Sequence, residues 1–254
     1  MKDNRVRQLV KDRKPAIGCF LGLGSPVVAE LMGLAGMDWL VVETEHNALD
    51  SAEVQQMLMA IGNTDAVPIV RVPNRDQVYI QRALDMGAMG ILVPGVRTAE
   101  EARAIVSYTR FPPVGIRSWG PLRASSYTLD NDDYLERAND NILVSLILET
   151  KDAVENLDEI CAVPGIDVLT IGPWDLSLEL GLDPRQLPLP EIEDISVKAL
   201  EIARAHGVEI GVSANTPDGL RERQSQGFTF IQYGPDYGLV TAAVTSGLAA
   251  LNRD

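Results

Sequence analysis

Short apolar runs alternate with helix-like segments eight times along this chain. Each run is rich in Val, Ile and Leu and ends at polar residues or at Gly and Pro. Continuous apolar runs of this kind predict strands that are buried on both faces, as in parallel sheets. The predicted strands cover residues 16–21, 39–43, 68–72, 90–93, 143–148, 168–171, 209–212 and 228–233. Eight strand-then-helix units in 254 residues predict an α/β fold, a (β/α)8 TIM barrel forming one domain over residues 1–254.

Two further helices flank the predicted barrel, and one long segment interrupts it. Residues 2–12 predict a short N-terminal helix, and the apolar residues 237–251 predict a C-terminal helix used in oligomerisation. Residues 111–139 look irregular, and loops of this length inside a compact domain are usually functional or disordered. The alternative fold is an open doubly wound sheet. Its nucleotide-binding turn would be Gly22–Pro26, a poor match to G-x-G-x-x-G.

Charge and cysteine content limit the classes of partner. The net charge is −14 and basic residues do not cluster, so we expect no nucleic-acid partner. The two cysteines, Cys19 and Cys161, lie in unlike contexts and predict neither a disulfide framework nor a cysteine zinc site. The first residues lack an apolar signal core, and no segment is apolar over the length of a membrane span. We therefore expect a cytoplasmic protein without a membrane partner.

Four chemically active side chains follow the predicted strands directly. His46 follows the second strand, Arg71 lies near the exit of the third, and Glu149 and Asp175 follow the fifth and sixth. In parallel barrels the carboxyl ends of the strands surround one mouth, where the chemistry takes place. His46 is therefore a candidate general base, because an imidazole exchanges protons near neutral pH. The competing interpretation is that the polar cluster around His46 simply caps the following helix.

The two carboxylates predict a metal site. Glu149 and Asp175 offer oxygen ligands without a cysteine partner, which suits Mg²⁺ or Mn²⁺, with Co²⁺ as a further possibility. Each carboxylate taken alone could equally be a helix cap. Arg71 carries a planar fork that can hold a carboxylate, or it could form a structural ion pair. Asp85 ends a predicted helix, where an acidic residue is electrostatically unfavourable, which hints at another role.

Several sequence strings resemble the HpcH/HpaI family of metal-dependent, class II pyruvate aldolases. They are GMDWLVVETEH, VPIVRV, ALDMGAMGILVP, RFPPVGIRS, LET and IGPWDLS, in order along nearly the whole chain. The resemblance extends to aldolases of 2-keto-3-deoxy sugar acids and of 4-hydroxy-2-oxo-heptanedioate. It implies that Glu149 and Asp175 bind the metal, and that His46 is the proton-transfer base.

The same resemblance implies roles for further residues. Asp85 would orient His46 and raise its basicity, and Arg71 would hold the pyruvyl oxygens and the enolate. Backbone amides around Gly172, Trp174 and Asp175 would receive the pyruvate carboxylate. The resemblance also implies a homo-oligomer, a hexamer or other trimer-based assembly, in which the last helix is exchanged between subunits.

Three positions depart from the family pattern. Ile147 stands where a Gln is common, Glu43 where an Asp is common, and Trp174 where a small residue is common. A Gln would donate a hydrogen bond near the keto oxygen or a water on the metal, which Ile cannot do. The bulk of Trp174 should reshape the aldehyde side of the pocket. These departures bear on the choice of substrate more than on the class of reaction.

We therefore expect an aldolase that reversibly cleaves a 4-hydroxy-2-keto acid to pyruvate and an aldehyde through a metal-stabilised enolate. A Schiff-base aldolase would need a buried lysine, and none lies within a predicted strand. Two alternatives remain. One is an acyl-CoA lyase of the citrate-lyase-like type, and the other is a non-catalytic barrel that binds keto acids, which Ile147 would favour.

Overall fold

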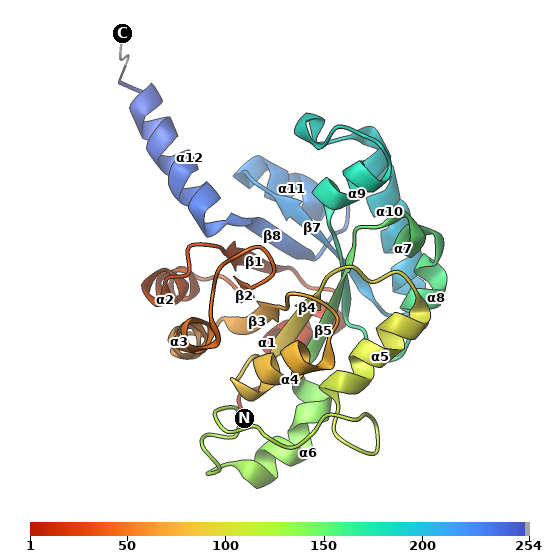
Figure 1. Cartoon of the computed structure of the whole chain (residues 1–254). Coiled ribbons are helices and arrows are strands. Elements are labelled where there is room, and N and C mark those ends of the chain that lie inside the picture. Colours follow the sequence, from red (N-terminus) through yellow and green to blue (C-terminus); the bar gives the residue numbers. More distant parts are fainter. Residues whose placement is uncertain (252–254) are drawn as a thin grey trace.

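Eight parallel strands close into a barrel in sequence order, which confirms the predicted TIM-barrel fold (Figure 1). The computed structural model describes residues 1–251, so the last three residues of the expected domain lie outside the described residues. The strands are β1 (Ala16–Leu21), β2 (Trp39–Glu43), β3 (Val67–Arg71), β4 (Gly90–Val93), β5 (Leu143–Leu148), β6 (Val168–Ile171), β7 (Glu209–Ala214) and β8 (Phe230–Pro235).

Helices surround the barrel and follow the strands. They are α1 (Arg5–Lys11), α2 (Pro26–Leu34), α3 (Ser51–Gly62), α4 (Gln77–Asp85), α5 (Ala99–Thr109), α6 (Asn131–Asn141), α7 (Lys151–Glu155), α8 (Leu157–Cys161), α9 (Pro173–Glu179), α10 (Pro190–Ala205), α11 (Pro217–Ser225) and α12 (Asp236–Ala249), with a 3₁₀ turn η1 (Pro184–Gln186). No helix among residues 1–251 combines the length and the apolar character that crossing a membrane requires.

Five strands have the bounds that the sequence predicts, and the other three are shifted or longer. β3 begins and ends one residue early, β7 extends two residues further, and β8 lies two residues later than expected. The extension of β7 brings Ser213 into the sheet, where it pairs with Gln232 of β8 at the same level of the barrel.

Two helices lie where the sequence suggested loops. α6 occupies part of the expected irregular segment, and only Tyr134 and Ala138 are buried on it. The two buried positions have helical spacing, but the segment is otherwise so polar that it looks like a loop in the sequence. α9 begins directly after β6 with Pro173 at its first turn. Proline is favoured at that position because its missing N–H would have no partner inside the helix.

The interior of the barrel is closed at one end only. Val6 and Val10 of α1 pack in the same cluster as Trp39 and Phe230, whose rings stack at 4.4 Å. α1 therefore covers the amino ends of the strands, and the packed interior leaves the carboxyl ends as the open mouth. A second, larger apolar cluster lies between the strands and the surrounding helices.

Candidate active site

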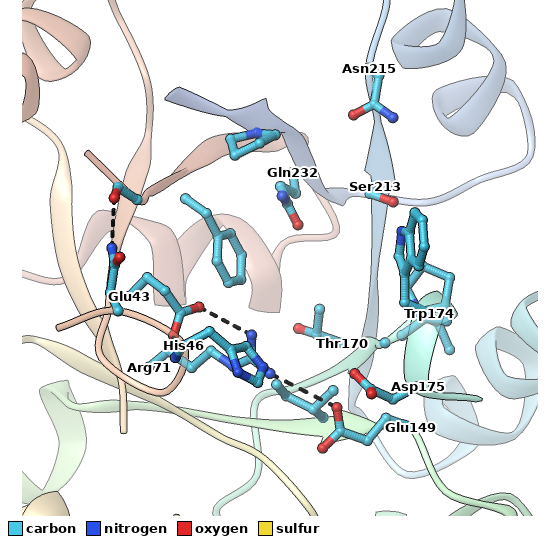
Figure 2. Close-up of a pocket in the computed structure, with 18 of the residues that line it drawn as sticks. Glu43, His46, Arg71, Glu149, Thr170, Trp174, Asp175, Ser213, Asn215 and Gln232 are labelled. Atoms are coloured by element: carbon cyan, nitrogen blue, oxygen red, sulfur yellow. Dashed lines mark hydrogen bonds and ion pairs between the residues drawn. The ribbon is translucent and has the colours of Figure 1, made fainter. Parts of the chain in front are cut away.

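A cavity of about 540 Å³ lies at the carboxyl ends of the strands (Figure 2). Its volume falls within the range of small-molecule sites. His46, Arg71, Glu149 and Asp175, which the sequence predicted to meet at one mouth, all line it. The other lining residues are Phe20, Gly22, Glu43, Asn47, Ile147, Thr170, Ile171, Gly172, Pro173, Trp174, Ser213, Asn215, Gln232, Pro235 and Tyr237.

Glu43 links Arg71 to the loop that carries His46. β2 and β3 place Glu43 beside Arg71 in register, and Nη1 of Arg71 lies 3.1 Å from Oε2 of Glu43. The other carboxylate oxygen, Oε1, accepts the backbone N–H groups of Glu45 at 2.7 Å and His46 at 3.2 Å. One side chain thus fixes both the guanidinium and the start of the loop. The Glu43 side chain is long enough to reach both groups.

A second carboxylate, that of Glu45, lies between Arg71 and His46. It forms an ion pair with Nη2 of Arg71, and its Oε2 lies 3.6 Å from Nε2 of His46. Burial raises the pKa of Glu45, and the charges of Arg71 and His46 oppose that rise. The His46 side chain remains 66% exposed at the mouth of the cavity, so its ring is accessible to a substrate.

Glu149 and Asp175 lie side by side on the next part of the rim (Figure 2). Oε1 of Glu149 accepts the N–H of Gly95 at 2.6 Å, while Oε2 lies 4.0 Å from Nη2 of Arg71. Burial is the main cause that raises the pKa of Glu149. The N–H of Gly95 and the charge of Arg71 lower it, and the charge of Asp175 raises it further. Two carboxylates this close favour a bound cation.

The start of α9 contacts Glu149 closely. A Cβ atom on Gly172 would lie 2.8 Å from the Cβ of Glu149, so only glycine allows this approach. The N–H of Gly172 donates to the carbonyl of Leu148 at 3.1 Å, so this amide is already used. The amides of Trp174 and Asp175 have no acceptor among residues 1–251, as is usual in the first turn of a helix. Of the three expected carboxylate-binding amides, only these two are available.

The donor set fits an ion that is held only partly by protein. Among residues 1–251, no three His, Cys, Asp or Glu side chains converge closely enough to hold an ion by themselves. Two carboxylates leave positions for substrate oxygens and water, which is how Mg²⁺ is usually bound. The charge balance agrees, because Glu43, Glu45, Glu149 and Asp175 face a single permanent cation, Arg71.

Asp85 is not part of this cavity. It ends α4, which runs back from the mouth, so Asp85 lies near the amino end of β4, at the opposite end of the barrel from His46. Its Oδ1 accepts a hydrogen bond from Nη2 of Arg117 at 2.8 Å, and that nitrogen also donates to the hydroxyl of Tyr134. The expected contact between Asp85 and His46 therefore does not form within one chain. The alternation of strands and helices already implied this separation, because a helix that ends just before a strand ends at the amino face of a barrel. The contact with His46 was expected only from the family resemblance.

Asp85 instead neutralises a buried cation. The Arg117 side chain is fully buried, and its guanidinium lies 4.6 Å from the ring centroid of Phe111. Its Nε and Nη1 atoms have no hydrogen-bond partner among the described residues. Desolvation raises the pKa of Asp85, and the hydrogen bond and charge of Arg117 lower it. The carboxylate is thus the only acidic partner of Arg117 among the ion pairs of residues 1–251.

Removing the negative charge of Asp85 should destabilise the fold. Asp85→Asn leaves the Arg117 guanidinium buried without a counterion, and we expect the free energy of unfolding to fall by about 3 kcal/mol. Urea unfolding followed by circular dichroism measures the change. Asp218→Asn is the matched control, because Asp218 pairs with Arg221 on the exposed surface and should give no measurable change. Equal stability of the two variants would show that Arg117 does not depend on Asp85.

Sequence reasoning missed one wall of the cavity, formed by Ser213, Asn215 and Gln232. Ser213 and Asn215 follow the predicted end of the seventh strand, but no role was inferred for them. Gln232 lay inside a predicted strand. The available signal was a polar side chain within an otherwise apolar run, since both faces of a barrel strand are normally buried.

The sequence of this chain matches a known protein family over most of its length. A family model described as HpcH/HpaI aldolase/citrate lyase matches residues 16–243. The chain belongs to this family. It is 36% identical over 245 residues to a 2-dehydro-3,6-dideoxy-6-sulfogluconate aldolase of Pseudomonas putida, covering 96% of this chain and 95% of the relative.

Two further proteins are similar to this chain over most of their length. A 5-keto-4-deoxy-D-glucarate aldolase of Salmonella paratyphi C is 34% identical over 240 residues, covering 94% of this chain and 93% of the relative. A crystal structure of a HpcH/HpaI aldolase/citrate lyase family protein from Burkholderia cenocepacia J2315 superposes with a TM-score of 0.91. It is 33% identical, over 98% of this chain and 100% of that one. The range matched by the family model, residues 16–243, contains all eight barrel strands and all the residues that line the cavity.

Proposed function

We propose that this HpcH/HpaI family member is a carbon–carbon lyase, a divalent-metal-dependent aldolase that reversibly cleaves a 4-hydroxy-2-keto acid to pyruvate and an aldehyde. The observation that carries the proposal is the convergence of His46, Arg71, Glu149 and Asp175 on one cavity at the mouth of the barrel. The aldolase names of the relatives support it. They give the acyl-CoA lyase alternative less support.

Glu149 and Asp175 are the residues proposed to hold the divalent ion, with Mg²⁺ or Mn²⁺ preferred and Co²⁺ acceptable. When bound, the ion supplies a Lewis acid that withdraws electron density from the keto group of the substrate. Oε2 of Glu149 lies 4.0 Å from Nη2 of Arg71. The guanidinium would therefore lie beside the substrate oxygens that the ion binds. Glu43 and Glu45 form ion pairs with Arg71 and orient its guanidinium group. They leave part of the guanidinium available to a substrate.

Arg71 is proposed to bind the pyruvyl oxygens and to stabilise the enolate as negative charge develops. A fixed cation in a partly buried site does this well, because no reorganisation is needed during the reaction. The free amides of Trp174 and Asp175 are proposed to receive the pyruvate carboxylate. Gly172 contributes by allowing the start of α9 to approach Glu149.

His46 is proposed as the proton-transfer base. In cleavage it takes the proton of the C4 hydroxyl, the C3–C4 bond breaks, and the electron pair passes into the enolate of pyruvate. In condensation it takes a proton from the pyruvate methyl group. Glu45 lies 3.6 Å from Nε2 of His46 and stabilises the charged imidazolium that each step produces. A role for Asp85 in orienting His46 would need a second copy of the chain.

A lysine-based mechanism receives no support from the cavity. The chain has five lysines, all within the described residues, and none lines the cavity. A Schiff base requires a buried amine with a lowered pKa. Ile147 lines the wall next to Glu149 and supplies no hydrogen bond to a substrate, so the keto group must be held by the ion and Arg71.

The oligomeric state and the cellular location of the protein are also proposals. α12 projects away from the barrel (Figure 1) and exposes Val240, Val244 and Leu248. We propose that it packs against another copy, in a hexamer or other trimer-based assembly. Cys19 and Cys161 are free and buried, and burial raises the pKa of each thiol to about 12. Unreactive, unpaired thiols agree with the cytoplasmic location expected from the sequence.

Cleavage of 4-hydroxy-2-keto acids tests the proposal. We expect pyruvate to be released only when Mg²⁺ or Mn²⁺ is present, as followed by coupling pyruvate to lactate dehydrogenase and NADH. Protein treated with a chelator should be inactive, and adding back the ion should restore the rate. Equal pyruvate release before and after chelation would contradict the metal-dependent mechanism.

A further inference from the structure

The proposed chemistry uses only part of the cavity. Arg71 is the last residue of β3, and His46, Glu149 and Asp175 follow β2, β5 and β6. The remaining wall comes from β7, β8 and β1. Figure 2 shows Ser213, Asn215 and Gln232 on the side of the cavity away from Glu149. A three-carbon keto acid held at the carboxylates leaves this side free for the aldehyde portion of the substrate.

Strand register brings the polar side chains of this wall together. Ser213 of β7 pairs with Gln232 of β8, so the two residues stand at the same level of the barrel. Asn215 lies two residues beyond Ser213, on the same face, just past the end of β7. The three residues carry a hydroxyl and two amides, which can each donate and accept hydrogen bonds.

These side chains are free to bind a ligand. Among residues 1–251, the only hydrogen bond between this group and another side chain runs from Nε of Arg223 to the backbone carbonyl of Ser213, at 3.3 Å. Thr170, deeper in the cavity, is instead engaged with the hydroxyl of Ser145 at 3.1 Å. Ser213 and Gln232 are partly buried, and Asn215 is exposed at the opening. Their side chains can therefore exchange hydrogen bonds with water for hydrogen bonds with a ligand.

The side chains of this wall carry no positive charge. Among the lining residues the cationic side chains are Arg71 and His46, and both stand at the carboxylate side of the cavity. Two cations outside the cavity are already paired with carboxylates. Arg223, behind Ser213, pairs with Glu193, and Arg97, in an adjoining pocket, pairs with Asp152 and Glu179. An aldehyde that carried a carboxylate, sulfonate or phosphate would therefore lack a counterion at this wall among residues 1–251. It would also experience repulsion from the acidic rim.

We infer that the wall formed by Ser213, Asn215 and Gln232 binds the hydroxyl groups of an uncharged, hydroxylated aldehyde of the glycolaldehyde or glyceraldehyde type. The inference rests on the proposed aldolase function and names its acceptor class. It separates this chain from the relatives above, whose names specify a sulfo group and a dicarboxylic sugar acid. Trp174 and Tyr237 also line the cavity and offer apolar surface to the C–H groups of such an aldehyde.

The reaction with this acceptor is balanced by the components present. The pyruvate methyl group loses one proton, and its carbon forms a bond to the aldehyde carbonyl carbon. The carbonyl electron pair moves to oxygen, which takes up a proton and becomes the C4 hydroxyl. The remaining hydroxyl groups of the aldehyde do not react. They serve only to bind the polar wall and to orient the carbonyl carbon.

The test compares five aldehydes with pyruvate and Mn²⁺: glycolaldehyde, D-glyceraldehyde, propanal, succinic semialdehyde and glyceraldehyde 3-phosphate. We expect kcat/KM for D-glyceraldehyde to exceed the values for propanal and for the two charged aldehydes by at least about tenfold, the effect of one or two hydrogen bonds. A preference for propanal or for either charged aldehyde would overturn the inference.

Two double variants test whether this wall causes the preference for the hydroxylated aldehyde. Ser213→Ala combined with Gln232→Leu should reduce the ratio of kcat/KM for D-glyceraldehyde to that for propanal by about tenfold. Ser225→Ala combined with Gln224→Leu makes the same changes on the exposed face of α11 and should leave the ratio unchanged. Circular dichroism checks the fold of each variant. If the double variant does not fold, Ser213→Ala alone carries the test, and an unchanged ratio in a folded variant contradicts the inference.

A separate measurement distinguishes failure of this inference from failure of the proposed function. Exchange of the pyruvate methyl protons with deuterated water needs no aldehyde. Exchange by the wild-type protein together with a preference for charged aldehydes would contradict the acceptor class alone. Absence of both exchange and condensation would overturn the aldolase function and the inference with it.

Discussion

Glu149→Gln and Asp175→Asn are each expected to reduce the rate of aldol cleavage by at least about 10³-fold. Lewis-acid stabilisation by a bound ion is worth several kcal/mol, and each ~1.4 kcal/mol corresponds to a factor of ten in rate. Both substitutions keep the size of the side chain but remove the negative charge that attracts the ion. The rate of pyruvate release measures the loss, and titration with Mn²⁺ followed by electron paramagnetic resonance measures binding of the ion.

The control for both substitutions is Glu155→Gln. Glu155 lies on α7 and faces solvent, where it pairs with Lys151. This variant should bind Mn²⁺ and cleave substrate as the wild type does. If Glu149→Gln or Asp175→Asn retained both tight Mn²⁺ binding and near-normal turnover, the ion would have to be held elsewhere, and the role given to this pair would be wrong.

His46→Ala and Arg71→Ala should have different kinetic effects. His46→Ala should lower kcat by roughly 10²–10⁴-fold, which is typical for the loss of a general base. It should change pyruvate binding little, because the proposed pyruvate ligands are the ion, Arg71 and backbone amides. Arg71→Ala should weaken pyruvate binding and lower kcat together, since the guanidinium contacts both the bound keto acid and the enolate.

Pyruvate titration and steady-state kinetics on each variant separate these effects. His206→Ala is the control for the first, because His206 pairs with Asp158 at the protein surface. Arg185→Ala is the control for the second, because Arg185 is exposed and pairs with Asp183. Near-normal turnover in His46→Ala, with turnover lost in Arg71→Ala, would assign proton transfer to another group and leave His46 a positioning role.

Sequence patterns predicted the barrel because its signals are local. Each strand is a short apolar run that ends at a polar residue or at Gly or Pro. Such a run can be recognised without knowledge of the rest of the chain. The same logic placed His46, Arg71, Glu149 and Asp175 at one mouth, since the carboxyl ends of parallel strands converge. The metal and catalytic roles of these residues stay predictions, supported by the geometry and by the family.

What the sequence could not provide depends on relations between elements. The bridge from Glu43 to Arg71 requires the register of β2 and β3, and the pairing of Ser213 with Gln232 requires that of β7 and β8. Asp85 looked functional because an acid at a helix end is unfavourable. Its partner, the buried Arg117, lies in the segment that had appeared irregular. Neither relation can be read from spacing along the chain.

Deuterium exchange into the methyl group of pyruvate tests the central claim most directly. The wild-type protein is incubated with pyruvate in deuterated water, with Mn²⁺ or with a chelator, and the methyl signal is followed by proton nuclear magnetic resonance. The arrangement of His46, Arg71, Glu149 and Asp175 predicts rapid loss of the methyl signal with Mn²⁺ and none above background with the chelator. A methyl signal that persists with Mn²⁺ while pyruvate is bound would mean that the cavity binds a keto acid without forming its enolate, and the aldolase mechanism would be wrong.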